Sequence, residues 1–268
     1  GVLIDLFSWR AAFFVPGVLC ALLGVAMLVQ WRAGQLGDRP MPANKGKPPS
    51  KGDMVKVFFV LMVTMFFSGI VFQATQYALP KMFEVRLGDI LGSGTTGIGI
   101  AVAAVYTASG VMQYFAGTLA DRFPLKGLYI TCFALQIPVL ALIASLFGLP
   151  LVGSAMLSAL LSVGALPAES MLIGRYTPTK HHGIAFGSKF VLAFGAGPVA
   201  LWMINLIQGG TGEFFWLFIL LAGMAAIATA AAFLLPNESK GDAMVQAAMK
   251  AGVNTPADEM EIAVPAAE

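Results

Sequence analysis

The sequence predicts an all-α polytopic membrane protein with about seven membrane-spanning helices. Of its 268 residues, 58% are hydrophobic and only 11% are charged, and the mean hydropathy is +0.81. A soluble domain carries about 25% charged residues, so this chain lacks the residues that would cover a water-facing surface. Its apolar residues also form continuous runs close to the roughly 20 residues that cross a bilayer as a helix.

The hydrophobic runs define the expected helices. Backbone N–H and C=O groups in lipid must be hydrogen-bonded within the chain, so each run is expected to be helical. The runs lack the two-residue alternation of a membrane β-strand, which excludes a β-barrel. The seven runs are Ala11–Trp31, Val55–Leu79, Gly97–Leu119, Gly127–Phe147, Leu149–Ile173, Gly183–Ile207 and Phe214–Leu235.

Lysine and arginine are distributed unequally between the two sides of the predicted helices. Ten lie in the connections on one side and three on the other, and the richer side is expected to be cytoplasmic. The ten are Arg32, Arg39, Lys45, Lys47, Lys51, Lys56, Arg122, Lys126, Arg175 and Lys180, and the three are Arg10, Lys81 and Arg86. The charges therefore predict that the Trp31–Lys56 connection and the C-terminal tail are cytoplasmic, and the membrane is expected to be a bacterial-type inner membrane. They are too scattered for a nucleic-acid site.

The chain divides into four parts. Residues 32–54 are rich in proline, glycine and lysine and are expected to form a cytoplasmic linker. The linker separates residues 1–31 from a six-helix unit at 55–235, and the alanine-rich tail at 236–268 is expected to be disordered. Because the chain begins inside a hydrophobic segment, we expect it to be a fragment.

A charged segment, Gly117–Lys126, connects two of the runs in a turn of six to eight residues. Gly117, Leu119, Ala120, Asp121, Arg122 and Lys126 follow the pattern G-x-L-A-D-R/K-x-G-R/K-R/K, with Pro124 and Leu125 as departures. The segment resembles the cytoplasmic loop motif of the major facilitator superfamily. Trp9-Arg10-Ala-Ala-Phe13 and Gly195-Ala-Gly197-Pro198 are similar to two further elements of that family.

The resemblance implies a bundle of twelve helices, of which about seven are present. Residues 1–31 would be the end of helix five and all of helix six, and 55–235 would be helices seven to twelve. It also implies that Gly117, Asp121, Arg122 and Lys126 form a gating latch at the cytoplasmic mouth. An anion near a helix N-terminus gains about 0.3–1 kcal/mol. The alternative is that these are ordinary solvated loop charges.

Glu169 and Lys189 are candidates for ion coupling. They lie on consecutive predicted helices, nine to eleven positions from the turn near Pro178, so antiparallel packing would place them at similar depth. An ionisable group at mid-membrane costs about 2.5–3.5 kcal/mol on insertion scales, and pairing would relieve that cost. Glu169 could exchange a proton, or the pair could be a gate. A static pair, or side chains that reach the cytoplasmic interface, is the alternative.

Amide and phenol side chains are the candidates for solute contact. Gln73, Gln76 and Tyr77 share one face of their helix, and Tyr106 and Gln113 form a similar stripe on the next. In the resembled family the first of these helices lines the central cavity. The alternative is hydrogen bonding between helices, worth about 0.6 kcal/mol on average.

No enzyme, metal or cofactor site is predicted. His181 and His182 lie in a loop with no Cys, Asp or Glu close in sequence, and no nucleophile–base set is evident. The predicted function is a secondary transporter that moves a small polar or amphipathic solute by alternating access, with protons as a candidate coupling ion. Its partners would be the solute, the bilayer and the missing N-terminal half. A drug efflux antiporter of the same fold, or a membrane receptor, is the alternative.

Overall fold

The computed structural model describes residues 9–34, 51–91, 95–177 and 181–235. These residues form seven α-helices, each long and apolar enough to cross a membrane. The predicted all-helical fold is confirmed for this part of the chain. The helices are α2 (Ala11–Arg32), α3 (Lys51–Leu91), α4 (Thr95–Arg122), α5 (Leu125–Ser145), α6 (Leu149–Tyr176), α7 (His182–Thr211) and α8 (Phe215–Phe233).

Some sequence-based expectations lie outside the described residues. They are the end of a preceding helix at 1–8, most of the linker at 35–50, and the tail at 236–268.

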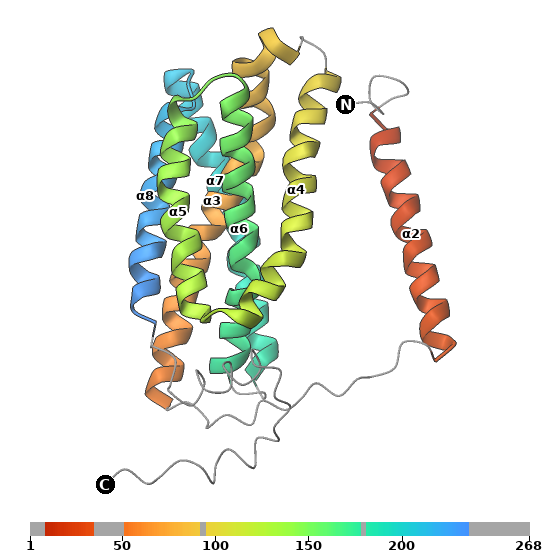
Figure 1. Cartoon of the computed structure of the whole chain (residues 1–268), viewed down its shortest axis with the longest axis vertical. Coiled ribbons are helices and arrows are strands. Elements are labelled where there is room, and N and C mark those ends of the chain that lie inside the picture. Colours follow the sequence, from red (N-terminus) through yellow and green to blue (C-terminus); the bar gives the residue numbers. More distant parts are fainter. Residues whose placement is uncertain (1–8, 35–50, 92–94, 178–180, 236–268) are drawn as a thin grey trace.

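Helices α3 to α8 form one bundle, whereas α2 stands apart from it (Figure 1). Within the bundle α3 packs against α4, α6, α7 and α8, and α5 packs against α6 and α8. Neighbours along the chain do not always pack closely, because α6 and α7 touch at few points. No side chain of α2 is buried, so all faces of this helix are open to lipid or to further helices.

The helix boundaries differ from the predicted runs, and two of the differences are large. α3 has 41 residues and continues well past Leu79 through Pro80. The turn between α4 and α5 was predicted to have six to eight residues, which is wrong, because only Phe123 and Pro124 are non-helical. Charged Asp121 and Arg122 are compatible with a helix end in water, and α4 stops only where Pro124 disfavours helical geometry at the residue before it.

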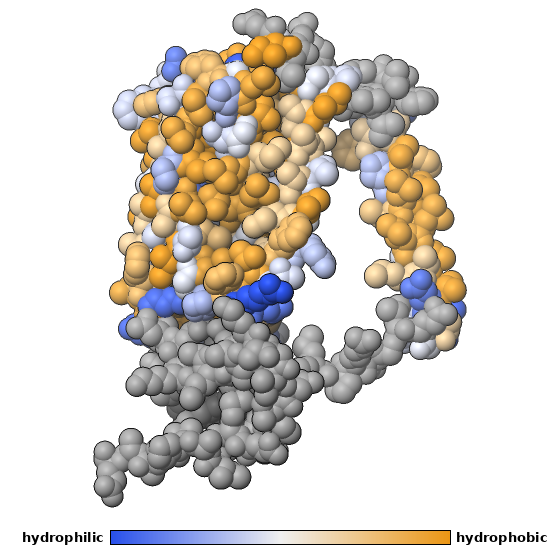
Figure 2. Space-filling view, in the orientation of Figure 1, coloured by the Kyte–Doolittle hydropathy of each residue, from blue (hydrophilic) through white to orange (hydrophobic). Residues whose placement is uncertain are grey.

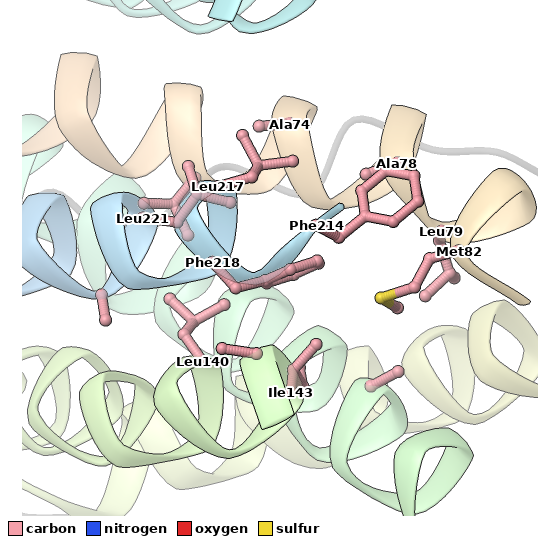
Figure 3. Packing of buried hydrophobic residues seen from close by; sticks show 14 of the residues in the cluster. Ala74, Ala78, Leu79, Met82, Leu140, Ile143, Phe214, Leu217, Phe218 and Leu221 are labelled. Atoms are coloured by element: carbon pink, nitrogen blue, oxygen red, sulfur yellow. The ribbon is translucent and has the colours of Figure 1, made fainter. Parts of the chain in front are cut away.

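Buried apolar side chains form two clusters, one toward each end of the bundle. Figure 3 shows the larger cluster, in which Phe214 and Phe218 lie between α3 and α5. The smaller cluster surrounds Tyr129 and extends toward Lys126 at the opposite end. The visible sides of the bundle are also mostly apolar, and strongly hydrophilic residues gather at the lower end (Figure 2). This distribution suits a helix bundle with lipid around its sides.

Arg86 joins α3 to the end of α5. Its guanidinium donates hydrogen bonds to the carbonyl oxygens of Ile143 (2.8 Å), Ala144 (3.0 Å) and Leu146 (3.1 Å). It also lies 4.8 Å from the ring centroid of Phe147. The last carbonyls of a helix have no partner within the helix and carry partial negative charge. Arg86 therefore caps α5 from a different helix.

We expect Arg86→Ala to lower the free energy of unfolding by about 2 kcal/mol, because three charge-assisted hydrogen bonds are lost and the carbonyls lose their cap. The free energy of unfolding of Arg86→Lys should lie between those of the wild type and Arg86→Ala, since one ammonium cannot replace the planar fork of the guanidinium. Unfolding of the three purified proteins tests this order. Lys81→Ala is the matched control, because Lys81 forms only an exposed pair with Glu84. An equal loss in both alanine variants would contradict the capping role.

Candidate functional site

A cavity of about 180 Å³ lies within the bundle between α3, α5, α6 and α7. Its walls are mainly apolar and include four phenylalanines, and its polar groups are two serines, two glutamines, a glutamate and a lysine. The lining residues are Met65, Ser68, Gly69, Phe72, Gln73, Phe133, Gln136, Ser162, Ala165, Leu166, Glu169, Lys189, Phe190, Ala193 and Phe194.

Small residues fix the position of this cavity. A Cβ atom added at Gly69 of α3 would lie 3.3 Å from Cα of Ala193 and 3.3 Å from Cβ of Ala196, both in α7. Helices in membranes approach closely at such small residues. Because α7 is held against α3 at this point and touches α6 only sparsely, a gap remains between α6 and α7.

Glu169 and Lys189 bridge this gap as an ion pair. Lys189 Nζ lies 2.9 Å from Glu169 Oε1, and the two side chains are only 9% and 5% exposed, respectively. Glu169 stands seven residues before the end of α6, and Lys189 stands seven residues after the start of α7. Both therefore lie about 10 Å along the helix axis from their common turn. The pairing explains how two charges are accommodated inside the bundle.

Further hydrogen bonds connect the ion pair to α3 and α5. Lys189 Nζ also donates to Oγ of Ser170, at 2.9 Å. Tyr129 Oη of α5 is a donor within reach of two acceptors, Glu169 Oε2 at 3.3 Å and Oγ1 of Thr64 in α3 at 2.9 Å. Thr64 in turn donates to the carbonyl of Leu61 at 3.0 Å. The ion pair thus belongs to a network that includes four helices.

The cavity contains one of the predicted solute-contact residues on α3. Gln73 lines it, whereas Gln76 is half-buried and does not. Tyr77 is 43% exposed, and its hydroxyl lies 3.2 Å from where a Cβ would stand on Gly197. Tyr77 therefore packs over the glycine of α7 that belongs to the Gly195–Pro198 element.

The predicted stripe on α4 lies away from this cavity. Tyr106 is half-buried against the larger apolar cluster, and Gln113 is exposed. Gln136 of α5 was not among the predicted contact residues, but it lies in the cavity wall. Its Nε2 donates to Oγ of Ser162 in α6 at 2.7 Å.

The residues of the predicted latch lie together at the Lys126 end of the bundle. Asp121 and Arg122 occupy the last turn of α4 and are exposed, and neither has a hydrogen bond or ion pair with another described residue. Gly117 lies one turn earlier with open space at its Cβ position. Lys126 donates from α5 to the carbonyl of Leu235, two residues after the end of α8, and so links that end of α8 to α5.

Of the two predicted loop histidines, His182 contacts the end of α6. Nε2 of His182 lies 2.7 Å from the carbonyl of Thr177 and 3.2 Å from that of Gly174, at the end of α6. Among the described residues, no group of three His, Cys, Asp or Glu side chains could hold a metal ion.

Sequence reasoning missed Tyr129, Ser170 and the phenylalanines of the cavity. These residues look like ordinary membrane-helix residues, and only the packing of α5 and α7 against α6 brings them to the ion pair. A signal was present for Ser170, because it follows Glu169 directly and can bond the same ammonium.

We expect Glu169→Gln and Lys189→Met each to lower the free energy of unfolding by about 3 kcal/mol, because each leaves one buried charge without its partner. The double variant should lose clearly less than the sum of the two, since no uncompensated charge remains. Unfolding of the four proteins under identical conditions measures this coupling. Additive losses would show that the pair contributes no interaction of its own.

A family model described as Major Facilitator Superfamily matches residues 82–257, which is more than half of the chain. No curated protein sequence gives a significant match. The family match agrees with the seven apolar helices and with the motif at Gly117–Lys126. The chain is therefore an integral membrane protein of the transporter class, and it belongs to the Major Facilitator Superfamily.

Proposed function

We propose that this chain is part of a secondary active transporter that moves a small polar or amphipathic solute by alternating access. In this proposal α3 to α8 form the C-terminal bundle, and α2 is the last helix of an N-terminal bundle. Two such bundles rock about a site near the membrane midplane. The charge asymmetry supports an orientation with residues 32–54 and the tail in the cytoplasm, and the proposed membrane is a bacterial inner membrane.

The buried pair of Glu169 and Lys189 carries the proposal. It joins α6 to α7 where these helices otherwise touch little, and it lines a cavity large enough for part of a solute. Ionisable groups inside a membrane bundle mark ion or substrate pathways. Protonation of Glu169 would weaken its attraction to Lys189 and allow α6 and α7 to separate. Glu169 is therefore the proposed proton carrier.

The cavity walls favour an amphipathic solute. Phe72, Phe133, Phe190 and Phe194 supply apolar surface, and Gln73 supplies hydrogen-bonding groups. Gln76, Tyr77, Tyr106 and Gln113 lie outside this cavity, and we propose them as contacts for other parts of the transport path. The aromatic lining also supports the second candidate, a drug efflux antiporter of the same fold.

We expect Glu169→Gln to abolish solute accumulation driven by a proton gradient. The rate of solute exchange without a gradient should stay within a few-fold of the wild-type rate. The amide can still accept hydrogen bonds but cannot carry a proton. The measurement uses the intact transporter in proteoliposomes, with solute and internal pH followed together. Glu84→Gln, an exposed carboxylate on α3, is the matched control. Unchanged proton-driven accumulation would remove Glu169 from coupling.

The exposed acid of the latch gives a separate prediction. Asp121 has no partner among the described residues, so we propose that it contacts the N-terminal bundle in one conformation. Asp121→Asn should then lower the transport rate at least tenfold and leave the unfolding temperature of the protein unchanged. Transport rates and thermal unfolding of the same preparation test this. A variant that transports normally would show that Asp121 is a solvated surface charge.

A further inference from the structure

Lys189 has hydrogen-bonding capacity that its protein partners do not use. A lysine ammonium has three donors. One points to Glu169 Oε1 and one to Ser170 Oγ, each at 2.9 Å. Ser170 gives its own hydrogen to the carbonyl of Leu166, so its oxygen is an acceptor for Lys189. The third donor of Lys189 has no acceptor among the described residues, and Lys189 lines the cavity.

Gln136 has an unused acceptor in the same cavity. The hydroxyl of Ser162 donates to the carbonyl of Ser158 at 3.0 Å. Its oxygen must therefore accept the bond from Gln136, which fixes Nε2 as the atom that faces Ser162. Oε1 of Gln136 then has no donor among the described residues, although the side chain is only 2% exposed. Gln73 likewise has no described hydrogen-bond partner and lines the cavity.

Glu169 differs from Lys189 because both of its oxygens have neighbours. While Glu169 is ionised, Oε1 accepts from Lys189 and Oε2 accepts from the hydroxyl of Tyr129 at 3.3 Å. The unused charged group of the cavity is therefore a donor on a cation. This arrangement favours an anionic ligand group over an ammonium.

The walls limit the rest of the ligand. The rings of Phe190 and Phe194 are stacked at an interplanar angle of 15° with centroids 6.1 Å apart, and Phe72 and Phe133 also line the space. The volume of about 180 Å³ is close to that of an engineered apolar cavity of about 150 Å³ that binds benzene. One ring, or an aliphatic group of that size, fits this space.

We propose that the cavity binds the carboxylate of a small organic acid with a single ring or a short branched aliphatic body. The carboxylate accepts from Lys189 and Gln73, and the apolar body lies among the phenylalanines. A hydroxyl or amino group on the body would donate to Oε1 of Gln136. This inference rests on the proposed transport function and specifies its substrate class.

The charge balance of this step requires a proton. The resting pair of Glu169 and Lys189 is neutral, and a second carboxylate would bring one excess negative charge to a pair whose side chains are buried. Two carboxylates at one site do not both stay ionised. The ligand therefore enters with one proton, which binds Glu169 Oε2 as the bond from Lys189 to Glu169 is replaced by one to the ligand. No net charge is added to the cavity.

Tyr129 would accept a hydrogen bond from the protonated Glu169. The titratable side chains that contact Glu169 in the described structure are Tyr129 from α5 and Lys189 from α7. A protonated Glu169 would donate to Tyr129 Oη, whose single hydrogen would then go to Thr64, and Thr64 donates to the carbonyl of Leu61. Every hydroxyl hydrogen in this relay then has an acceptor. The relay is thus arranged to hold the protonated state.

Calorimetric titration of the purified intact transporter with benzoate and cyclohexanecarboxylate tests the proposal. Parallel titrations in two buffers of different ionisation enthalpy give the number of protons taken up. We expect both acids to bind with uptake of about one proton, because two carboxylates sharing the site hold one between them. Benzamide and benzylamine, which match benzoate in size, should bind at least tenfold more weakly.

Variants separate the roles of the two charged residues. Glu169→Gln should bind benzoate as tightly or more tightly than the wild type and take up no proton, because the competing carboxylate is gone. Lys189→Met should weaken benzoate at least tenfold, whereas Lys189→Arg, which keeps the cation, should stay within tenfold. Lys81→Met removes an exposed lysine and should change nothing. Each variant is first checked for unchanged helix content and a single oligomeric form.

Three results would overturn the carboxylate assignment. They are no binding of either acid to folded wild-type protein, equal binding of benzamide, and acid binding without proton uptake. If benzylamine binds while Glu169→Gln still abolishes proton-driven accumulation, the proposed transport function is retained and the substrate class is cationic. If proton-driven accumulation is unchanged in Glu169→Gln but benzoate still binds through Lys189, the proposed coupling role of Glu169 is wrong and the carboxylate site is retained.

Discussion

One buried ion pair determines how α6 and α7 are held together. Separately, Glu169 and Lys189 would each lose several kcal/mol of hydration inside the bundle, so neither residue is suited to this position without the other. Their 2.9 Å contact is reinforced from α3 and α5 through Thr64 and Tyr129. Two charges thus connect four helices around the cavity, and the space beside them remains open because α6 and α7 share few other contacts.

Polar contacts matter in this bundle because lipid does not drive helices together as water does. Close packing supplies part of the attraction, as at Gly69 against Ala193. Long cationic side chains supply another part through hydrogen bonds to backbone carbonyls at helix ends. Arg86 caps α5 at one end of the bundle, and at the other end Lys126 bonds the carbonyl of Leu235 just beyond α8. The polar contacts in the interior and at the two ends therefore fix the relative heights of the helices, while the apolar clusters fill the space between them.

Local patterns made the helices and the depth of Glu169 and Lys189 predictable. Continuous apolar runs require helices in lipid, and equal distances from one turn place two residues side by side in an antiparallel pair. The cavity was not predictable, because it depends on the distance between α6 and α7, which is set by the close packing of α7 against α3 at Gly69. Tyr129 and Gln136 gain partners only through that packing. The length of the α4–α5 turn was misjudged because hydropathy marks the membrane boundary, whereas the helix continues into water.

The neutrality of the resting pair constrains what can replace it. A low-dielectric site tolerates an exchange of partners far better than an added charge. In the proposed bound state Lys189 would pair with a ligand carboxylate and Glu169 would carry a proton, so the cavity would again hold one cation and one anion. Both states are then compatible with burial, and the difference between them is the contact that joins α6 to α7. Replacing that contact would change the link between two helices at no cost in net charge, and in our proposal this exchange couples binding to a change of conformation.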